Sequence, residues 1–248
     1  MGRSSSNCVV VGGALSRSRF RAVIFDGDDT LWLTEGLYDV ARSRARDLVE
    51  QAGLDGSEWE QKQRRRDLEN VVAHGHTVDR FPRSCVEALD LTFGTSASLT
   101  AELRERVADA ARSVFTAQAP LREGAREVLG ELKCRGIRLA LLSKGDERVQ
   151  RRRVTDSGLT GYFELVSIVD AKTPQAFVSV LRQLALSADD VVSVGNSVAS
   201  DIQPSLAAGI TAVWLPAYVW EYENRHGVDD ERWLKRISAL SELLDIVG

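Results

Sequence analysis

An apolar run that leads into closely spaced carboxylates is the part of this sequence best suited to chemistry. Residues 23–25 are Val, Ile and Phe, and Asp26, Asp28 and Thr30 follow them. Side chains alternate across a strand, so Asp26 and Asp28 can face the same crevice if the chain stays extended. One carboxylate could then attack a phosphoryl group while the other moves a proton. The segment predicts a nucleophile for phosphoryl transfer.

Polar side chains also follow other apolar runs further along the chain. They are Ser143, Lys144, Lys172, Asn196 and Asp201. The carboxyl ends of parallel strands meet at one edge of a sheet, so we expect these groups to converge near Asp26. Hydroxyl and ammonium groups can hold phosphoryl oxygens, and a cation can screen a carboxylate from phosphate.

The elements that must position these residues form an alternating pattern. Short Val/Ile/Leu-rich runs predict strands, and helical periodicity predicts the segments between them. We expect strands over residues 22–26, 137–142, 164–168, 191–194 and 211–215, and helices over 123–135, 146–156, 174–185 and 201–208. Right-handed crossovers would give an α/β fold, a three-layer Rossmann-like parallel sheet core.

A long helical stretch interrupts this pattern after the first strand. Helical spacing with charged faces recurs over 37–51, 58–73, 82–91 and 99–115, and no clear strand is present. An insert at this point would lie over the carboxyl ends of the sheet and act as a lid. The domain prediction is therefore a core of residues 21–35 and 119–248 with an inserted all-helical cap over 36–118. Residues 1–20 are expected to form a tail, with an added edge strand as the alternative.

The order of these motifs resembles the haloacid dehalogenase-like (HAD) hydrolase superfamily over residues 21–215. The first motif of that family, D-x-D-x-T, fits Asp26, Asp28 and Thr30. Its second motif fits Ser143, and its third-motif lysine fits Lys172. The insert resembles the helical cap of the first cap class of this superfamily.

The resemblance implies a covalent mechanism. Asp26 would form an aspartyl-phosphate, and Asp28 would protonate the leaving alkoxide and then activate water. Thr30, Ser143 and Lys172 would hold the phosphoryl oxygens. Lys144 offers a second ammonium group, and Ser143 has the alternative role of capping the next helix.

The fourth motif, G-D-x-x-x-x-D, is only approximated, because Asn196 stands where the family usually has an aspartate. The resemblance implies Mg²⁺ bound by the Asp26 carboxylate, the Asp28 backbone carbonyl and a fourth-motif side chain. If that side chain is Asn196, the site has one negative charge fewer and binds Mg²⁺ more weakly. Asp201 would compensate for the missing charge, either as a direct ligand or through a contact with a ligand. A helix cap is the alternative role of Asn196.

Residues 74–83 form a polar, glycine-punctuated break between cap helices. His76 and Arg80 in this break could bind the non-phosphate part of a substrate, although an ordinary interhelical loop is an equal alternative. Four aromatic residues lie at and after the end of the last predicted strand, and we expect them to pack on the sheet edge, with an approach to the site from the carboxyl rim as the alternative. They are Trp214, Tyr218, Trp220 and Tyr222.

Composition narrows the range of partners. The formal net charge is -4, so the chain has no global basic field for nucleic acid, and no apolar run reaches membrane-spanning length. The Arg runs at 64–66 and 151–153 are interpreted as solvated helix faces. Three widely spaced cysteines lack a ligand or redox spacing and indicate a reduced, cytoplasmic setting. We expect a monomer or homodimer.

The sequence thus predicts a Mg²⁺-dependent phosphatase that acts on a small phosphorylated metabolite. A phosphomutase would use the same intermediate. A metal-independent dehalogenase of the same fold would not need Asp28. A catalytically impaired protein that binds a phosphate ligand is the third alternative, prompted by Asn196.

Overall fold

The computed structural model describes residues 19–217 and 234–248. Most of the predicted N-terminal tail lies outside these residues, as does Cys8. Three of the four aromatic residues expected at the sheet edge also lie outside them: Tyr218, Trp220 and Tyr222.

A parallel sheet forms the centre of the core, in the order β3-β2-β1-β4-β5-β6. The strands are β1 (Ala22–Phe25), β2 (Arg138–Lys144), β3 (Leu165–Val169), β4 (Val191–Gly195), β5 (Thr211–Trp214) and β6 (Leu234–Arg236). The five predicted strands are confirmed. Strand β6 was not predicted, because its three residues, Leu, Lys and Arg, carry no apolar run.

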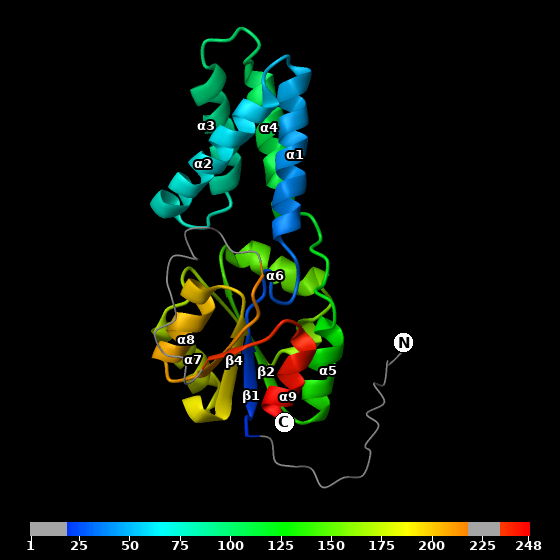
Figure 1. Ribbon diagram of the computed structural model, residues 1–248, viewed down its shortest axis with the longest axis vertical. Helices are drawn as coiled ribbons and strands as arrows, with labels where there is room; N and C mark the ends of the chain where they lie inside the picture. Colours follow the sequence, from blue (N-terminus) through cyan, green and yellow to red (C-terminus); the bar gives the residue numbers. More distant parts are fainter. Residues whose placement is uncertain (1–18, 218–233) are drawn as a thin grey trace.

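Helices cover both faces of this sheet (Figure 1). Val23 and Phe25 belong to an apolar cluster that includes side chains of α5 (Ala125–Cys134) and α9 (Leu243–Val247). Ala22 and Ile24 point to the other face, where they join a cluster with α7 (Pro174–Leu184). This alternation confirms the three-layer, Rossmann-like arrangement.

Two helices follow the strands that bear site residues. Helix α6 (Glu147–Asp156) begins just after β2, and Asp146 caps it by accepting hydrogen bonds from the Arg148 and Val149 amides. The predicted helix over 201–208 is divided: a π-helical turn (Val198–Ile202) precedes the short α8 (Gln203–Ala207). Four short 3₁₀ segments complete the described elements: Ser113–Phe115, Thr160–Tyr162, Ala188–Asp190 and Leu240–Glu242.

The insert consists of helices, as expected. Helices α1 (Glu35–Gln51), α2 (Gly56–His74), α3 (Arg80–Phe93) and α4 (Ala101–Arg112) stand together above the carboxyl edge of the sheet (Figure 1). Their apolar faces form a separate core that includes the fully buried Trp59 and Phe81. We call this helical insert the cap.

The two chain segments that join the cap to the core lie side by side. The Leu33 amide donates to the Pro120 carbonyl at 2.8 Å, and the Arg122 amide donates to the Leu31 carbonyl at 2.9 Å. The cap therefore starts and ends on one paired linker.

The structure describes two of the cysteines, Cys85 and Cys134, and the helices that could be examined as membrane spans. Cys85 is a free thiol buried in the cap core. Cys134 is disulfide-bonded, so the interpretation of the cysteines as reduced is not confirmed. Among the described residues, no helix combines the length and apolar composition that crossing a bilayer requires.

Candidate active site

A pocket of roughly 110 Å³, partly open to solvent, lies between the carboxyl edge of the sheet and the cap. The core contributes most of the predicted site residues that line it. They are Asp26, Asp28, Lys144, Lys172, Asn196 and Asp201. The predicted convergence at one edge of the sheet is observed for these side chains.

Asp26 lies at the base of this pocket, directly after β1. Its amide donates to the Val194 carbonyl at 2.9 Å, which continues the ladder between β1 and β4. The Lys172 Nζ donates to Asp26 Oδ1, whereas Asp26 Oδ2 is buried and accepts no hydrogen bond from the described residues. Burial and the nearby Asp201 carboxylate raise the pKa of Asp26 to about 7, although Lys172 acts in the opposite direction.

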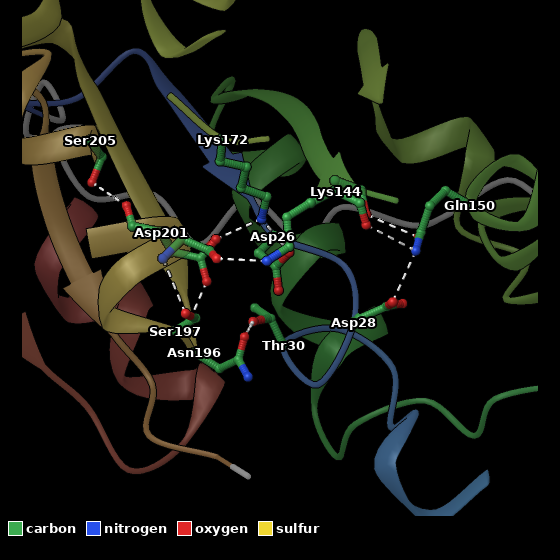
Figure 2. Close-up of polar contacts among 12 residues, drawn as sticks. Asp26, Asp28, Thr30, Lys144, Gln150, Lys172, Asn196, Ser197, Asp201 and Ser205 are labelled. Atoms are coloured by element: carbon green, nitrogen blue, oxygen red, sulfur yellow. Dashed lines mark hydrogen bonds and ion pairs between the residues drawn. The ribbon is translucent and has the colours of Figure 1, made fainter. Parts of the chain in front are cut away.

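Lys172 connects the two buried carboxylates. Its Nζ also donates to Asp201 Oδ1 at 2.6 Å, and both side chains are buried (Figure 2). Burial alone would lower the pKa of Lys172, but Asp201 and Asp26 more than offset this effect and raise it. Lys172 therefore remains an ammonium group that neutralises part of the negative charge of the site.

Asp201 approaches the end of β4 closely because residue 195 is glycine. A Cβ on Gly195 would lie 2.3 Å from the Asp201 side chain, which no other residue could accommodate without a shift. The Ser197 amide donates to Asp201 Oδ2 at 2.9 Å. Both Asp201 oxygens thus have partners inside the protein.

Asp28 lines the same pocket, but its carboxylate points away from Asp26 and toward α6 (Figure 2). The Trp32 indole donates to Oδ1 at 2.6 Å, and Gln150 Nε2 and Arg153 Nη1 donate to Oδ2 at 2.9 and 2.5 Å. The chain does not stay extended after Asp26: the Leu31 amide donates back to the Gly27 carbonyl at 2.8 Å. The expected alignment of the two carboxylates along one strand is therefore not observed.

The turn after Asp26 depends on two local features. A Cβ on Gly27 would lie 2.5 Å from the Trp32 ring, so only glycine fits there. Asp29 has a φ of 58°, in the left-handed region that Asp tolerates better than most residues. Its carboxylate accepts hydrogen bonds from the Thr34 and Glu35 amides at 2.8 and 3.2 Å, and thereby fixes the start of α1.

The two predicted hydroxyl groups lie behind the lining of the pocket. Thr30 is fully buried, and its hydroxyl donates to Asn196 Oδ1 at 3.4 Å. Ser143, at the carboxyl end of β2, donates to Gln150 Oε1 at 3.0 Å. Neither hydroxyl is among the groups that line the pocket, so both would have to turn to reach a phosphoryl group.

Lys172, the predicted third-motif lysine, and Lys144, its alternative, have different partners. Lys172 binds the two carboxylates, whereas Lys144 Nζ donates to the Ser200 hydroxyl at 2.9 Å, on the opposite wall. The Lys172 ammonium contacts Asp26 directly.

Four cap residues complete the pocket: Glu35, Tyr38, His76 and Arg80. His76 and Arg80 therefore lie where a substrate-binding role requires, at the break between α2 and α3. Arg80 also forms a buried ion pair with Asp67 of α2. Burial raises the pKa of Glu35 to about 7, against the opposing effect of Arg42.

The oxygen donors at the base of the pocket fit Mg²⁺ chemically. Carboxylate and amide oxygens are the hard ligands that Mg²⁺ prefers, and Asp26 Oδ2 is a buried carboxylate oxygen without a hydrogen-bond donor among the described residues. Asn196 in place of aspartate leaves one carboxylate fewer. Within the described ranges, no group of three or more His, Cys, Asp or Glu side chains is arranged to hold a metal ion.

Sequence reasoning missed two polar residues of α6 that contact Asp28. Gln150 was assigned no role, and Arg153 was included in a run interpreted as a solvated helix face. That interpretation is wrong for Arg153, which is 7% exposed, whereas Arg151 and Arg152 are exposed. Helical spacing could have indicated that Arg153 is buried, because it lies on the same face of the helix as Gln150 and Val154.

The family model described as haloacid dehalogenase-like hydrolase matches residues 20–209. Curated relatives include a phosphoserine phosphatase of Thermus thermophilus, 28% identical over 79% of this chain and 88% of its own length. The human N-acylneuraminate-9-phosphatase is also 28% identical, over 80% of this chain and 83% of its own length.

Solved structures give the same result. A haloacid dehalogenase-like family hydrolase from Xanthomonas campestris superposes with a TM-score of 0.78 and 27% identity, over 93% of this chain and 95% of that chain. L-2-haloacid dehalogenase from Xanthobacter autotrophicus, at 20% identity and a TM-score of 0.61, shares the fold over 92% of this chain and 98% of that chain. With its parallel α/β core and its match over residues 20–209, the chain belongs to the haloacid dehalogenase-like hydrolase family.

Proposed function

We propose that this protein is a Mg²⁺-dependent phosphatase that hydrolyses a small phosphomonoester through an aspartyl-phosphate at Asp26. The observation that carries this proposal is the state of Asp26. Its carboxylate is buried at the base of the pocket, with one oxygen held by Lys172 and the other without a donor among the described residues. A nucleophile needs such an uncommitted oxygen facing the substrate.

The chain's own residues would divide the work as follows. Asp26 Oδ2 attacks phosphorus, and the ester oxygen leaves with a proton from Asp28. Asp28 then takes a proton from the water that hydrolyses the aspartyl-phosphate. Lys172 stays with Asp26 and attracts the phosphoryl oxygens, joined by the Thr30 and Ser143 hydroxyls once these turn toward the pocket.

For the metal, Asp26 would supply the carboxylate oxygen that does not attack phosphorus, Asn196 its side-chain oxygen, Asp28 its backbone carbonyl, and Asp201 a contact from the next layer. When bound, Mg²⁺ would screen the repulsion between the carboxylate and the incoming phosphate. The Asp201 oxygens already bind Lys172 and Ser197, which favours Asn196 over Asp201 as the direct ligand.

The phosphatase assignment is also supported by the names of the curated relatives, which include phosphoserine, N-acylneuraminate-9-phosphate and glyceraldehyde 3-phosphate phosphatases. Each of these names refers to a small phosphorylated metabolite, but the metabolite differs from one relative to the next. Arg80 and His76 on the cap side would bind the non-phosphate part of the substrate. We propose a cytoplasmic enzyme, monomeric or homodimeric, with no nucleic-acid or membrane partner.

A catalytically impaired, phosphate-binding protein is the second candidate, favoured by Asn196 in the fourth motif. A test that separates the two measures phosphate release from 4-nitrophenyl phosphate and from a panel of phosphorylated sugars, amino acids and organic acids. The phosphatase predicts turnover that requires Mg²⁺ and is lost with EDTA. Binding of inorganic phosphate without turnover in saturating Mg²⁺ would favour the second candidate.

The same assay addresses the other two alternatives. Halide release from a 2-haloacid without metal would favour a dehalogenase, and phosphoryl transfer to a second hydroxyl of the substrate would favour a mutase. The dehalogenases among the structural neighbours are 19–22% identical and support the fold alone.

A further inference from the structure

The predicted acid/base, Asp28, is held by donors from outside the first motif. Three donors occupy both of its oxygens: Trp32 from the same loop, and Gln150 and Arg153 from α6. With these contacts the carboxylate faces α6, on the side opposite Asp26 (Figure 2). In this orientation both Asp28 oxygens are directed to donors other than a group bound at Asp26.

Arg153 supplies the strongest of these contacts. Its Nη1 donates to Asp28 Oδ2 at 2.5 Å, and the guanidinium is 7% exposed. Hydrogen bonds between two charged groups are roughly twice as strong as neutral ones, and burial of the guanidinium reduces the solvent screening of this contact, although the Asp28 side chain is 29% exposed. The Tyr38 hydroxyl of cap helix α1 also interacts with Arg153, so the cap contacts this pair.

Gln150 connects Asp28 with a second predicted catalytic residue. Its amide nitrogen donates to Asp28 Oδ2 at 2.9 Å, while its amide oxygen accepts the Ser143 hydroxyl at 3.0 Å. Gln150 Nε2 also donates to the Lys144 carbonyl at 3.3 Å, so both of its N–H groups are already in use. One buried amide therefore contacts both the predicted phosphate-binding hydroxyl and the predicted acid/base.

We propose that Gln150 and Arg153 form a latch that keeps Asp28 turned away from Asp26 until a phosphoryl group engages Ser143. This inference rests on the proposed phosphatase function and deepens it. A phosphoryl oxygen that accepts the Ser143 hydroxyl removes the donor that fixes Gln150 Oε1. The Gln150 amide then loses the contact that fixes its orientation and turns away from Asp28, whose carboxylate, left with Trp32 and Arg153 alone, is freer to rotate toward the pocket. Gln150 and Arg153 are thus positioning residues.

The latch can be tested without turnover through the Trp32 indole, because its N–H donates to Asp28 Oδ1 in the latched state. The chain has five tryptophans, so five indole N–H signals are expected in a nitrogen–proton correlation spectrum, and Trp32→Phe assigns the one that matters. Gln150→Met and Arg153→Met should each shift the Trp32 signal in the absence of ligand. Gln183→Met and Arg152→Met, at exposed positions, are the matched controls and should leave it in place.

Inorganic phosphate with Mg²⁺ should move the wild-type Trp32 signal in the same direction as the latch variants do. An unmoved Trp32 signal in both folded latch variants would overturn the proposal. So would saturable phosphate binding, measured by calorimetry, that leaves the wild-type signal in place.

A comparison of kcat/KM for two substrates separates the latch from a purely structural role of Gln150 and Arg153, because a structural role would affect both substrates alike. Phenyl phosphate has a poorer leaving group than 4-nitrophenyl phosphate and depends more on Asp28 as an acid. Releasing the latch should raise kcat/KM for phenyl phosphate by about tenfold, the order expected for one hydrogen bond to a charged group. The value for 4-nitrophenyl phosphate should change less, and the gain should vanish in an Asp28→Asn background. Arg153→Lys, which keeps the charge, should stay close to wild type.

An equal fall of kcat/KM for both substrates in the two latch variants would overturn the proposal, because it would mean that α6 orients Asp28 for the reaction. Absence of wild-type turnover would instead count against the proposed function. In that case the Trp32 signal of the latch variants still tests whether Gln150 and Arg153 hold Asp28 away from Asp26.

Discussion

At the scale of single residues, Lys172 determines how two buried carboxylates coexist at the base of the pocket. Asp26 and Asp201 both contact its ammonium group, and Asp201 would otherwise act on Asp26 only as a like charge. The pKa of Asp26 is nevertheless raised to about 7 by burial and by Asp201. A bound cation would oppose both effects and favour the ionised nucleophile.

Asn196 offers a direct test of the metal proposal. Asn196→Asp restores the carboxylate that the fourth motif usually carries, and the Thr30 hydroxyl can still donate to it. We expect the Mg²⁺ concentration for half-maximal activity to fall by about three- to tenfold, because a charged ligand binds the cation more tightly than an amide. The measurement is a Mg²⁺ titration of phosphatase activity. An unchanged or weaker Mg²⁺ dependence would contradict the role of Asn196 as a ligand.

The sequence was informative about residues whose chemistry follows directly from a strand end. Asp26, Lys172 and Asp201 lie together, as their positions after β1, β3 and β4 predict. Arg153 could not be identified in this way, because a run of three arginines is usually a solvated face. Only the packing of α6 against the first-motif loop separates the buried arginine from its two exposed neighbours.

At the scale of elements, buried polar and charged side chains connect α2 and α3. Arg80 and Asp67 form an ion pair with both side chains nearly inaccessible, at 2% and 1% exposure. Nearby, Asn70 of α2 donates to the Ser84 hydroxyl of α3 at 3.0 Å. Because Arg80 also lines the pocket, this pair fixes one wall of the site from inside the cap.

Removing one partner of that pair should destabilise the protein. Asp67→Ala leaves the Arg80 charge buried without its carboxylate, and we expect the free energy of unfolding to fall by about 3 to 5 kcal/mol. Urea denaturation followed by circular dichroism measures this change. Glu58→Ala, which removes an exposed ion pair with Lys62, is the control and should change stability by less than about 1 kcal/mol. A loss of similar size in both variants would contradict the importance of burial.

Most elements were predictable because their signals are local. The five long strands are apolar runs between helical segments, and Pro174 after Thr173 marks the start of α7. Two features depended on tertiary context. Strand β6 forms only because it pairs with β5, and the π-helical turn at Val198–Ile202 brings Asp201 against Gly195, a close approach that helical periodicity does not encode.

At the scale of the whole molecule, the paired linker attaches the helical cap above the carboxyl edge of the sheet (Figure 1). Arg122 strengthens this junction: its Nε donates to the Thr30 carbonyl at 3.0 Å, and its Nη2 donates to the Asp29 carbonyl. The first-motif loop and the linker are therefore one connected structure. Movement of the cap would act directly on the loop that carries Asp28.

Glu35, where the cap begins, makes global stability depend on pH. Its pKa in the folded protein is raised from 4.5 to about 7, mainly by burial. Between these values the unfolded chain loses a proton that the folded protein retains, so the free energy of unfolding falls as pH rises from about 4.5 to 7. Glu35→Gln removes this titration and should gain about 1 to 2 kcal/mol relative to wild type over that interval, after allowance for partial exposure.

Urea denaturation of wild type and Glu35→Gln at pH 5 and pH 8 checks this dependence. Glu102→Gln, at an exposed position of α4, serves as the matched control. A constant difference between wild type and Glu35→Gln across this range would show that Glu35 does not titrate as its burial indicates.

The central claim is that Asp26 attacks phosphorus, and one comparison tests it most directly. Phosphate release from 4-nitrophenyl phosphate in saturating Mg²⁺ is measured for wild type and Asp26→Asn, with folding checked by circular dichroism. The covalent mechanism predicts that wild type turns over and that Asp26→Asn loses at least about a thousandfold in kcat. Full activity in the folded Asp26→Asn variant would contradict the account.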